Sequence, residues 1–117
     1  MAKLELIFNN HDSSKKTFDT IKVNLAKVLE PFSGQIEHIG STAIPDAITK
    51  PVLDILIIAK SLEDQKKIVP LLTQSGYIQG ELDKNQTKLF FSKPKKKDIN
   101  NEFLNYIHLH LAYENTT

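Results

Sequence analysis

The chain has 117 residues, of which 40% are hydrophobic and 25% charged. Its formal net charge is +1, from 15 lysine and arginine residues and 14 aspartate and glutamate residues. This length and composition predict one globular domain with a single core, and the balanced charge gives no general attraction to nucleic acid or membrane surfaces. The absence of cysteine excludes disulfides, cysteine-ligated zinc and thiol nucleophiles.

The sequence carries no pattern typical of a membrane span or a secretory signal. Its apolar stretches fall well short of the roughly 20 residues that a membrane-spanning helix needs. The first residues, MAKLELIFNN, lack the charged, apolar and small-residue regions of a signal peptide. We therefore expect a cytoplasmic protein, with neither a membrane nor a nucleic acid as its partner.

The first half of the chain predicts a helix and two strands. Apolar residues at spacings of three and four give residues 13–32 one helical face, and Pro31 ends the helix. Residues 35–39 (QIEHI) are a short predicted strand that leads into Gly-Ser-Thr. The run VLDILIIA (52–59) is almost continuously apolar and rich in β-branched residues, which indicates a central strand covered on both faces.

The second half predicts a helix and three strands. The helix is expected over 62–74, with a capping box formed by Ser61 and Asp64 and a kink or early stop at Pro70. Three strands follow, with a loop or hairpin tip over 93–102 before the last one: residues 77–80, 87–92 and 103–114. This order predicts a mixed α/β (α+β) fold over residues 1–117, in which helices flank a mixed β-sheet.

The tripeptide Gly40-Ser41-Thr42 is a candidate anion-binding turn. A glycine turn after a strand brings backbone N–H groups close to an anion, and the two hydroxyls add donors or cap a short helical turn. Most such tripeptides are ordinary turns or caps, so this motif is weak evidence by itself. His38 at the end of the preceding strand and Lys50 at the entrance to the next one are further candidates to face a bound phosphate. Each is explained equally well as a surface residue, which for a lysine is the usual outcome.

Asp54 is the unusual residue of the central strand. A carboxylate inside an apolar run is costly unless it is hydrogen-bonded, paired or bound to a metal. Because strand side chains alternate, Val52, Asp54 and Leu56 share one face of the sheet. The ordinary interpretation is a paired aspartate near the start of a strand, but its position soon after the Gly-Ser-Thr turn favours a functional site.

His108 and His110 form the third candidate element, a His-x-His pair on the last strand. Alternation places both side chains on one face, about 6.5 to 7 Å apart along the strand. They suit a shared metal, a bracket around a phosphate, or proton transfer. A half-exposed strand whose polar face contains two histidines explains them equally well.

Two other patterns receive an ordinary structural interpretation. The basic run KPKKK (93–97) has no aromatic residue between its lysines, so a solvated loop is favoured over a nucleic-acid site. Tyr77, Phe90 and Phe91 are expected in the core rather than in a base-stacking platform.

The stretches HIGSTAIPDAITKPVLDILI (38–57) and YIHLHL (106–111) together resemble the two signatures of the GrpB family, uncharacterised proteins sometimes fused to dephospho-CoA kinase. The resemblance runs from about residue 20 onward and departs from the family pattern at Asp46, where glycine is usual. Family members usually continue after the His-x-His strand into C-terminal helices. We expect this chain to lack them, as a truncated or naturally minimal member.

The resemblance implies a nucleotidyltransferase-like fold, because the family is placed in that superfamily. The superfamily pattern is Gly-Ser on a turn followed by Asp-x-Asp on the next strand. Gly40 and Ser41 match the turn that holds nucleotide phosphates, and Asp54 matches the first metal-binding carboxylate. The second carboxylate position holds Leu56, a loss that members of the family share.

Leu56 disfavours ordinary two-metal transfer, because that chemistry needs bridging carboxylates for its metal pair. If the His-x-His strand lies beside the Asp54 strand, His108 and His110 approach Asp54. The three residues are then a candidate catalytic cluster. They either hold one divalent metal (Mg, Mn, Zn or Fe) or act without metal in acid–base chemistry on a phosphate held at Ser41.

The sequence therefore predicts a protein that binds a nucleotide or a phosphorylated small molecule at the Gly-Ser-Thr turn. Three functional classes stay open at this point. They are a nucleotidyltransferase-like enzyme with altered metal chemistry, a non-catalytic nucleotide- or phosphate-binding module, and an interaction domain in which the polar cluster orders the sheet.

Overall fold

The computed structural model describes residues 7–8, 11–45, 48–49, 52–80, 88–94 and 106–114. Two helices, α1 (His11–Leu29) and α2 (Leu62–Gln74), and a 3-10 turn, η1 (Ser41–Ala43), are described. The described strands are β1 (Ile7–Phe8), β2 (Ser33–Ile39), β3 (Ile48–Thr49), β4 (Val52–Ala59), β5 (Ile78–Gln79), β6 (Leu89–Pro94) and β7 (Tyr106–Tyr113). The short β1 and β3, which pair with each other, have no counterpart in the sequence prediction.

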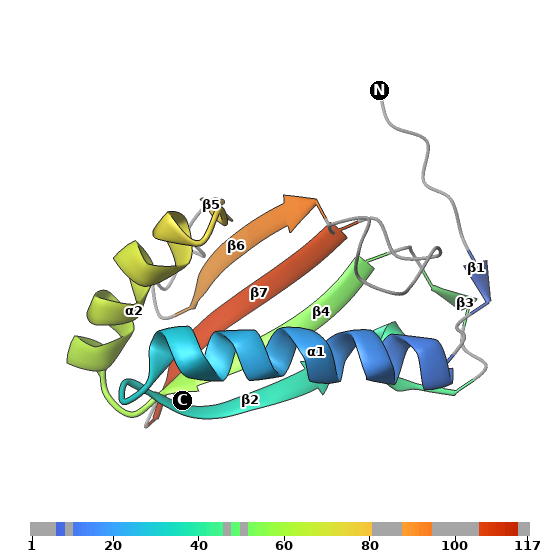
Figure 1. Cartoon of the computed structure of the whole chain (residues 1–117), viewed down its shortest axis with the longest axis horizontal. Coiled ribbons are helices and arrows are strands. Elements are labelled where there is room, and N and C mark those ends of the chain that lie inside the picture. The colour runs from blue at the N-terminus through green and yellow to red at the C-terminus, as the bar shows by residue number, and fades with distance from the viewer. Residues whose placement is uncertain are drawn as a thin grey trace.

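The main sheet is mixed and contains five strands in the order β2-β4-β7-β6-β5 (Figure 1). β4 and β7 pair in parallel at its centre, and the pairs β2–β4, β6–β7 and β5–β6 are antiparallel. The predicted mixed α/β (α+β) class is therefore confirmed. The parallel contact between β4 and β7 joins segments that are about fifty residues apart in the sequence.

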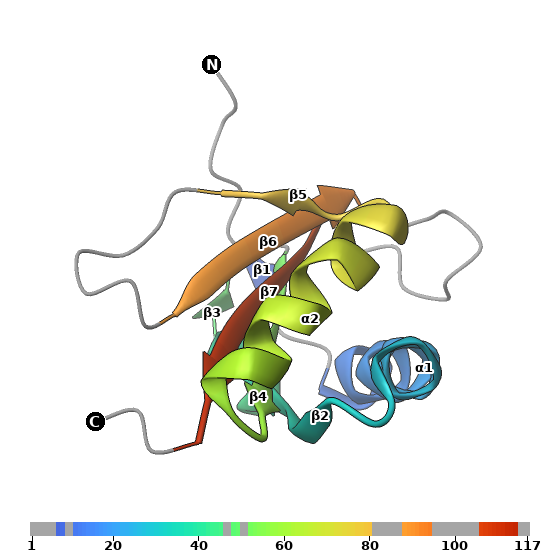
Figure 2. The same cartoon turned by 90° about the vertical axis from the view of Figure 1, so that its left-hand side faces the viewer.

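Both helices pack on the same face of this sheet (Figure 2). Along β4, buried residues alternate with half-buried ones, so Leu53, Ile55 and Ile57 face the helices and Asp54 and Leu56 face the other way. The core combines these positions with the apolar faces of α1 and α2 and with the matching residues of β6 and β7. The prediction that β4 is covered on both faces is wrong for the described elements, because a continuous apolar run does not reveal how many faces are covered.

Most predicted elements are found close to their expected bounds. β4 and α2 coincide with the predictions 52–59 and 62–74, and the Ser61 hydroxyl accepts the Asp64 backbone N–H at 3.1 Å, as a helix cap should. The expected early stop at Pro70 is wrong, because α2 continues to Gln74. α1 begins and ends earlier than residues 13–32.

The C-terminal strands are shifted or shortened relative to the prediction. β5 lies within the expected 77–80, and β7 falls within 103–114. β6 begins at Leu89 and takes in Lys93 and Pro94, the first residues of the predicted loop 93–102; the rest of that loop lies outside the described residues. No helix in the described part of the chain is both long and apolar enough to cross a membrane.

One-sided coverage of the sheet predicts unequal costs for two adjacent isoleucines of β4. Ile57 is fully buried against the helices and Ile58 is half-buried on the opposite face. We expect Ile57→Ala to lower the free energy of unfolding by about 3 to 4 kcal/mol and Ile58→Ala by about 1 kcal/mol. Urea denaturation of the two variants measures this, and equal losses would contradict the one-sided core.

Candidate functional site

The Gly40-Ser41-Thr42 turn lies directly against the carboxylate of Asp54. Ile39, the last residue of β2, pairs with Asp54 on β4, so the turn begins where the carboxylate lies. A Cβ atom on Gly40 would lie 2.7 Å from Asp54 Oδ2 and 3.2 Å from Asp54 Cβ. Gly40 also has φ of 76° and ψ of −171°, a region open almost only to glycine. Backbone conformation and contact with Asp54 therefore both require glycine here.

The helical turn expected after Gly40 is present as η1, but its predicted cap is not. The N-cap residue is Gly40, and no side chain hydrogen-bonds as a cap at this end. The backbone closes the turn instead, since Ala43 N–H donates to the Gly40 carbonyl and Ile44 N–H to the Ser41 carbonyl, both at 3.1 Å. Ser41 itself is half-buried.

Asp54, His108 and His110 come together on the face of the sheet that the described helices leave open. The parallel register pairs Asp54 with His108 and Leu56 with His110. His110 Nε2 lies 3.1 Å from Asp54 Oδ1, within hydrogen-bond distance, and His108 Nδ1 lies 3.8 Å from the same oxygen. The three side chains keep 27% to 36% of their surface exposed. A solute can therefore reach a cluster that is still partly shielded from water.

Phe90 is a neighbour of this cluster that the sequence interpretation assigned wrongly. It pairs with His110 across β6 and β7, and its ring lies 4.9 Å from the His108 ring and 5.5 Å from the His110 ring, edge to face. Phe91 and Tyr77 are buried in the core as expected, but Phe90 is half-buried on the open face. Strand alternation alone contained this signal, because adjacent residues of one strand cannot both face the core.

His38 and Thr42 lie behind the turn, on the helix-covered side. His38 pairs with Ile55, a core position, and its ring stacks on Phe18 of α1 at 5.0 Å. His38 Nε2 is 2.9 Å from the Thr42 hydroxyl oxygen, and the Thr42 side chain is fully buried. Their position indicates that these two side chains hold the turn in place from the core.

The remaining sequence candidates are Lys50 and Leu56. Leu56 lies on the same face as Asp54 and opposite His110 in register, as strand alternation predicts. Lys50 lies outside the described residues, and so does Asp46, the position at which the sequence departs from the family pattern.

The described side chains do not form a metal centre as they lie. Nowhere in the described ranges do three or more His, Cys, Asp or Glu residues group as they would around a metal ion. Both histidine nitrogens approach a single carboxylate oxygen, and His110 Nε2, at 3.1 Å, is within hydrogen-bond distance of it. A divalent metal at Asp54, His108 and His110 stays a prediction without support from this geometry.

Comparison with known proteins identifies the family. A family model described as GrpB protein matches residues 7–117. The chain belongs to the GrpB family. Two curated relatives are similar to parts of it: UPF0157 protein BH1888 of Halalkalibacterium halodurans, 37% identical over 62 residues, and UPF0157 protein YqkA of Bacillus subtilis, 36% identical over 75 residues. The matched segments cover 53% and 64% of this chain, but only 32% and 22% of those relatives.

Solved structures show the same fold at lower sequence identity. The conserved protein GrpB from Enterococcus faecalis has a TM-score of 0.76 at 18% identity, with 96% of this chain and 63% of that chain covered. The Cid1 poly(U) polymerase, in a structure described as bound to MgGTP, has a TM-score of 0.54 at 14% identity. The match covers 90% of this chain and 32% of the Cid1 chain. This GrpB chain therefore has a nucleotidyltransferase-like fold and spans less than two thirds of these proteins.

The contact between Gly40 and Asp54 predicts a destabilising substitution. Gly40→Ala should lower the free energy of unfolding by about 2 to 4 kcal/mol, because it adds a steric clash to the cost of a positive φ. Gly76→Ala is the matched control: Gly76 has φ of 96° but open space around its Cβ position, so about 1 kcal/mol is expected. Equal losses in urea denaturation would show that Asp54 does not constrain the turn.

The unequal distances from Asp54 to its two histidines predict unequal coupling. A double-mutant cycle of Asp54→Ala with His110→Ala should give a coupling of about 1 kcal/mol in the free energy of unfolding, reduced from a buried value by the exposure of the pair. The same cycle with His108→Ala, at the longer distance, should give less than about half of this. A larger coupling for His108 would contradict the geometry of the cluster.

Proposed function

We propose that this GrpB domain binds a nucleotide or a phosphorylated small molecule, with a phosphate at the Gly40–Ser41 turn and the reacting or recognised group beside Asp54, His108 and His110. The observation that carries the proposal is the contact of the turn with the Asp54 carboxylate, which itself accepts a hydrogen bond from His110. An anion-binding turn and an acid–base cluster then share one solvent-accessible place on the sheet.

Each part of the site has a separate task in this proposal. Gly40 has no side chain, so no Cβ atom separates the backbone of the turn from an anion, and the half-buried Ser41 hydroxyl is a further donor in this proposal. Thr42 and His38 hold the turn from the core side through their 2.9 Å contact. Lys50 is the residue that we expect to add a positive charge at the phosphate.

The cluster is suited to move a proton. When Asp54 accepts the His110 Nε2–H, the other ring nitrogen, Nδ1, is the acceptor of the neutral ring and can take a proton from a ligand. A carboxylate that orients a histidine in this way also stabilises the ring once it is protonated. The negative charge of Asp54 repels a phosphate at the adjacent turn, and a histidine that has taken a proton from the ligand offsets this charge.

We favour ligand binding as the function of this domain over nucleotidyl transfer that uses two metal ions. Cid1 is described as a poly(U) polymerase, but the likeness to this chain is one of fold. Leu56 lies where a second bridging carboxylate would have to be, on the same face as Asp54. A nucleotidyltransferase-like reaction with an atypical metal such as Mg, Mn or Zn is the second candidate, and it has the nucleotidyltransferase-like fold as its support.

A thermal-shift screen tests the proposed binding site. The ligands are inorganic phosphate, nucleoside mono-, di- and triphosphates and coenzyme A intermediates, each with and without Mg, Mn or Zn. A ligand that binds only the folded state at about 100 times its dissociation constant adds about 2.7 kcal/mol to the free energy of unfolding. Ser41→Ala should weaken this stabilisation at least threefold in affinity, while Ser33→Ala, at the far end of β2, should not.

The same panel separates the two candidate functions. Metal-dependent release of pyrophosphate from a nucleoside triphosphate, abolished by Asp54→Ala, would establish transfer and overturn the preference for binding alone. If no ligand stabilises the protein, or if Ser41→Ala and Ser33→Ala respond alike, the assignment of the turn as a phosphate site is wrong.

A further inference from the structure

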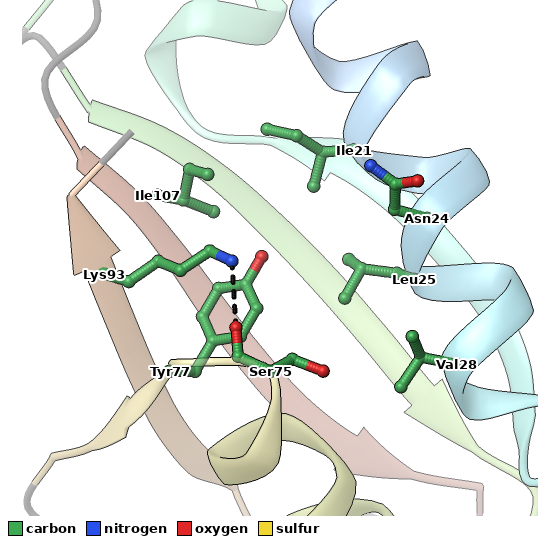
Figure 3. A pocket seen from close by; sticks show the side chains of 8 residues that line it. All are labelled: Ile21, Asn24, Leu25, Val28, Ser75, Tyr77, Lys93 and Ile107. Atoms are coloured by element: carbon green, nitrogen blue, oxygen red, sulfur yellow. Dashed lines mark hydrogen bonds between the residues drawn. The ribbon is translucent and has the colours of Figure 1, made fainter. Parts of the chain in front are cut away.

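A cavity of about 90 Å³ lies on the other face of the sheet from the candidate phosphate site. It is bounded by α1, by the junction of α2 and β5, and by β6 and β7 (Figure 3). Its wall on β7 is Ile107, whose neighbour His108 points to the opposite face. The cavity is therefore separated from the Asp54 cluster by the thickness of the sheet, and the proposed function does not use it.

The lining combines apolar and polar side chains. The helix α1 and β7 supply the apolar side chains, Ile21, Leu25, Val28 and Ile107. The polar side chains are Ser75, Tyr77 and Lys93, which lie across the cavity from α1, and Asn24 on α1 itself (Figure 3). None of the described residues that line the cavity is acidic, and Lys93 is the basic side chain among them.

Tyr77 is the feature that calls for an occupant. Its side chain is only 4% exposed, and its hydroxyl points into the cavity (Figure 3). Among the described residues, none forms a hydrogen bond with this hydroxyl. Burying a hydroxyl without a partner is unfavourable, and nearly all buried polar groups in proteins have a partner. Burial raises the pKa of Tyr77 to about 12, so at neutral pH the phenol is a neutral hydrogen-bond donor.

Lys93 places a cation next to this donor. Its ammonium group lies 4.2 Å from the centre of the Tyr77 ring and donates to the Ser75 carbonyl at 3.2 Å. These two contacts hold the half-buried ammonium beside the phenol, at the polar side of the cavity. A cation and a neutral O–H donor at one place match the two oxygens of a carboxylate.

We propose that this cavity is a second ligand site, which binds a short-chain carboxylate. The carboxylate accepts hydrogen bonds from the Lys93 ammonium and the Tyr77 hydroxyl, and the alkyl chain contacts Ile107 and the apolar face of α1. A cavity of about 150 Å³ holds benzene, so this smaller one suits a chain of about two to four carbon atoms. Propionate is the natural probe, and propionamide is its neutral counterpart of the same shape.

The test is a titration of the whole chain by two-dimensional ¹H–¹⁵N NMR. Propionate should cause saturable shifts of amides around the cavity, among them Leu25, Tyr77 and Lys93, with a dissociation constant on the order of 1 to 10 mM, as befits about five heavy atoms. Propionamide should bind at least tenfold more weakly, because it brings no charge to Lys93.

Two variants and one control assign the polar contacts. Lys93→Met keeps most of the side-chain volume and should weaken propionate binding at least tenfold. Tyr77→Phe removes only the hydroxyl, should weaken binding about threefold to tenfold, and should leave thermal stability unchanged or higher, because it removes an unpartnered buried group. Lys66→Met, at an exposed lysine of α2, should bind like the wild type.

Several outcomes would overturn the proposal. One is equal binding of propionate and propionamide, and another is wild-type affinity for propionate in both Lys93→Met and Tyr77→Phe. The others concern the wild-type protein: amide shifts that map away from the cavity, or shifts that do not saturate at propionate concentrations well above the expected dissociation constant. The cavity would then be a place that water fills to satisfy the Tyr77 hydroxyl. The wild-type titration decides the question even if a variant fails to fold.

Discussion

The parallel pairing of β4 with β7 is the constraint on which the candidate site depends. In this register Leu53, Ile55 and Ile57 lie beside Ile107, Leu109 and Leu111, and all six are buried under the helices. Because strand side chains alternate, this burial places Asp54 beside His108 on the open face. A slip of one residue would turn the opposite face of β7, which carries His108 and His110, toward the core. The free energy of the core therefore fixes the geometry of the polar cluster.

The turn at Gly40 adds a second, local constraint to the one that the pairing of β4 with β7 imposes. β2 pairs with β4 so that its last residue, Ile39, lies beside Asp54, and the chain must bend away immediately afterwards. Only glycine satisfies the positive φ and the close approach to the carboxylate together. His38, one residue earlier, points the other way, where its ring stacks on Phe18 and contacts Thr42. The turn is thus held by the core on one side and bounded by the carboxylate on the other.

The sequence predicts the elements whose signals are local. The Ser61 cap, the apolar face of α2 and the run 52–59 are properties of neighbouring residues, so their bounds are predicted correctly. The face on which His38 lies depends on the register of β2 with β4, where His38 pairs with Ile55. η1 and β3 separate these two strands in the sequence, and a single sequence contains no record of that pairing. Phe90 is a different kind of error, because alternation with the buried Phe91 already places it on the open face.

The replacement of a second carboxylate by Leu56 is consistent with the arrangement of the histidines. Leu56 lies opposite His110 in register, so a carboxylate at position 56 would compete with Asp54 for the N–H of that ring. With leucine there, the described acceptor of His110 is Asp54 Oδ1, at 3.1 Å. A site that gathers two histidines around one carboxylate and a site that bridges two metals with two carboxylates are therefore alternative uses of the same strand face. In this GrpB chain the sequence at position 56 and the geometry of His110 both favour the first.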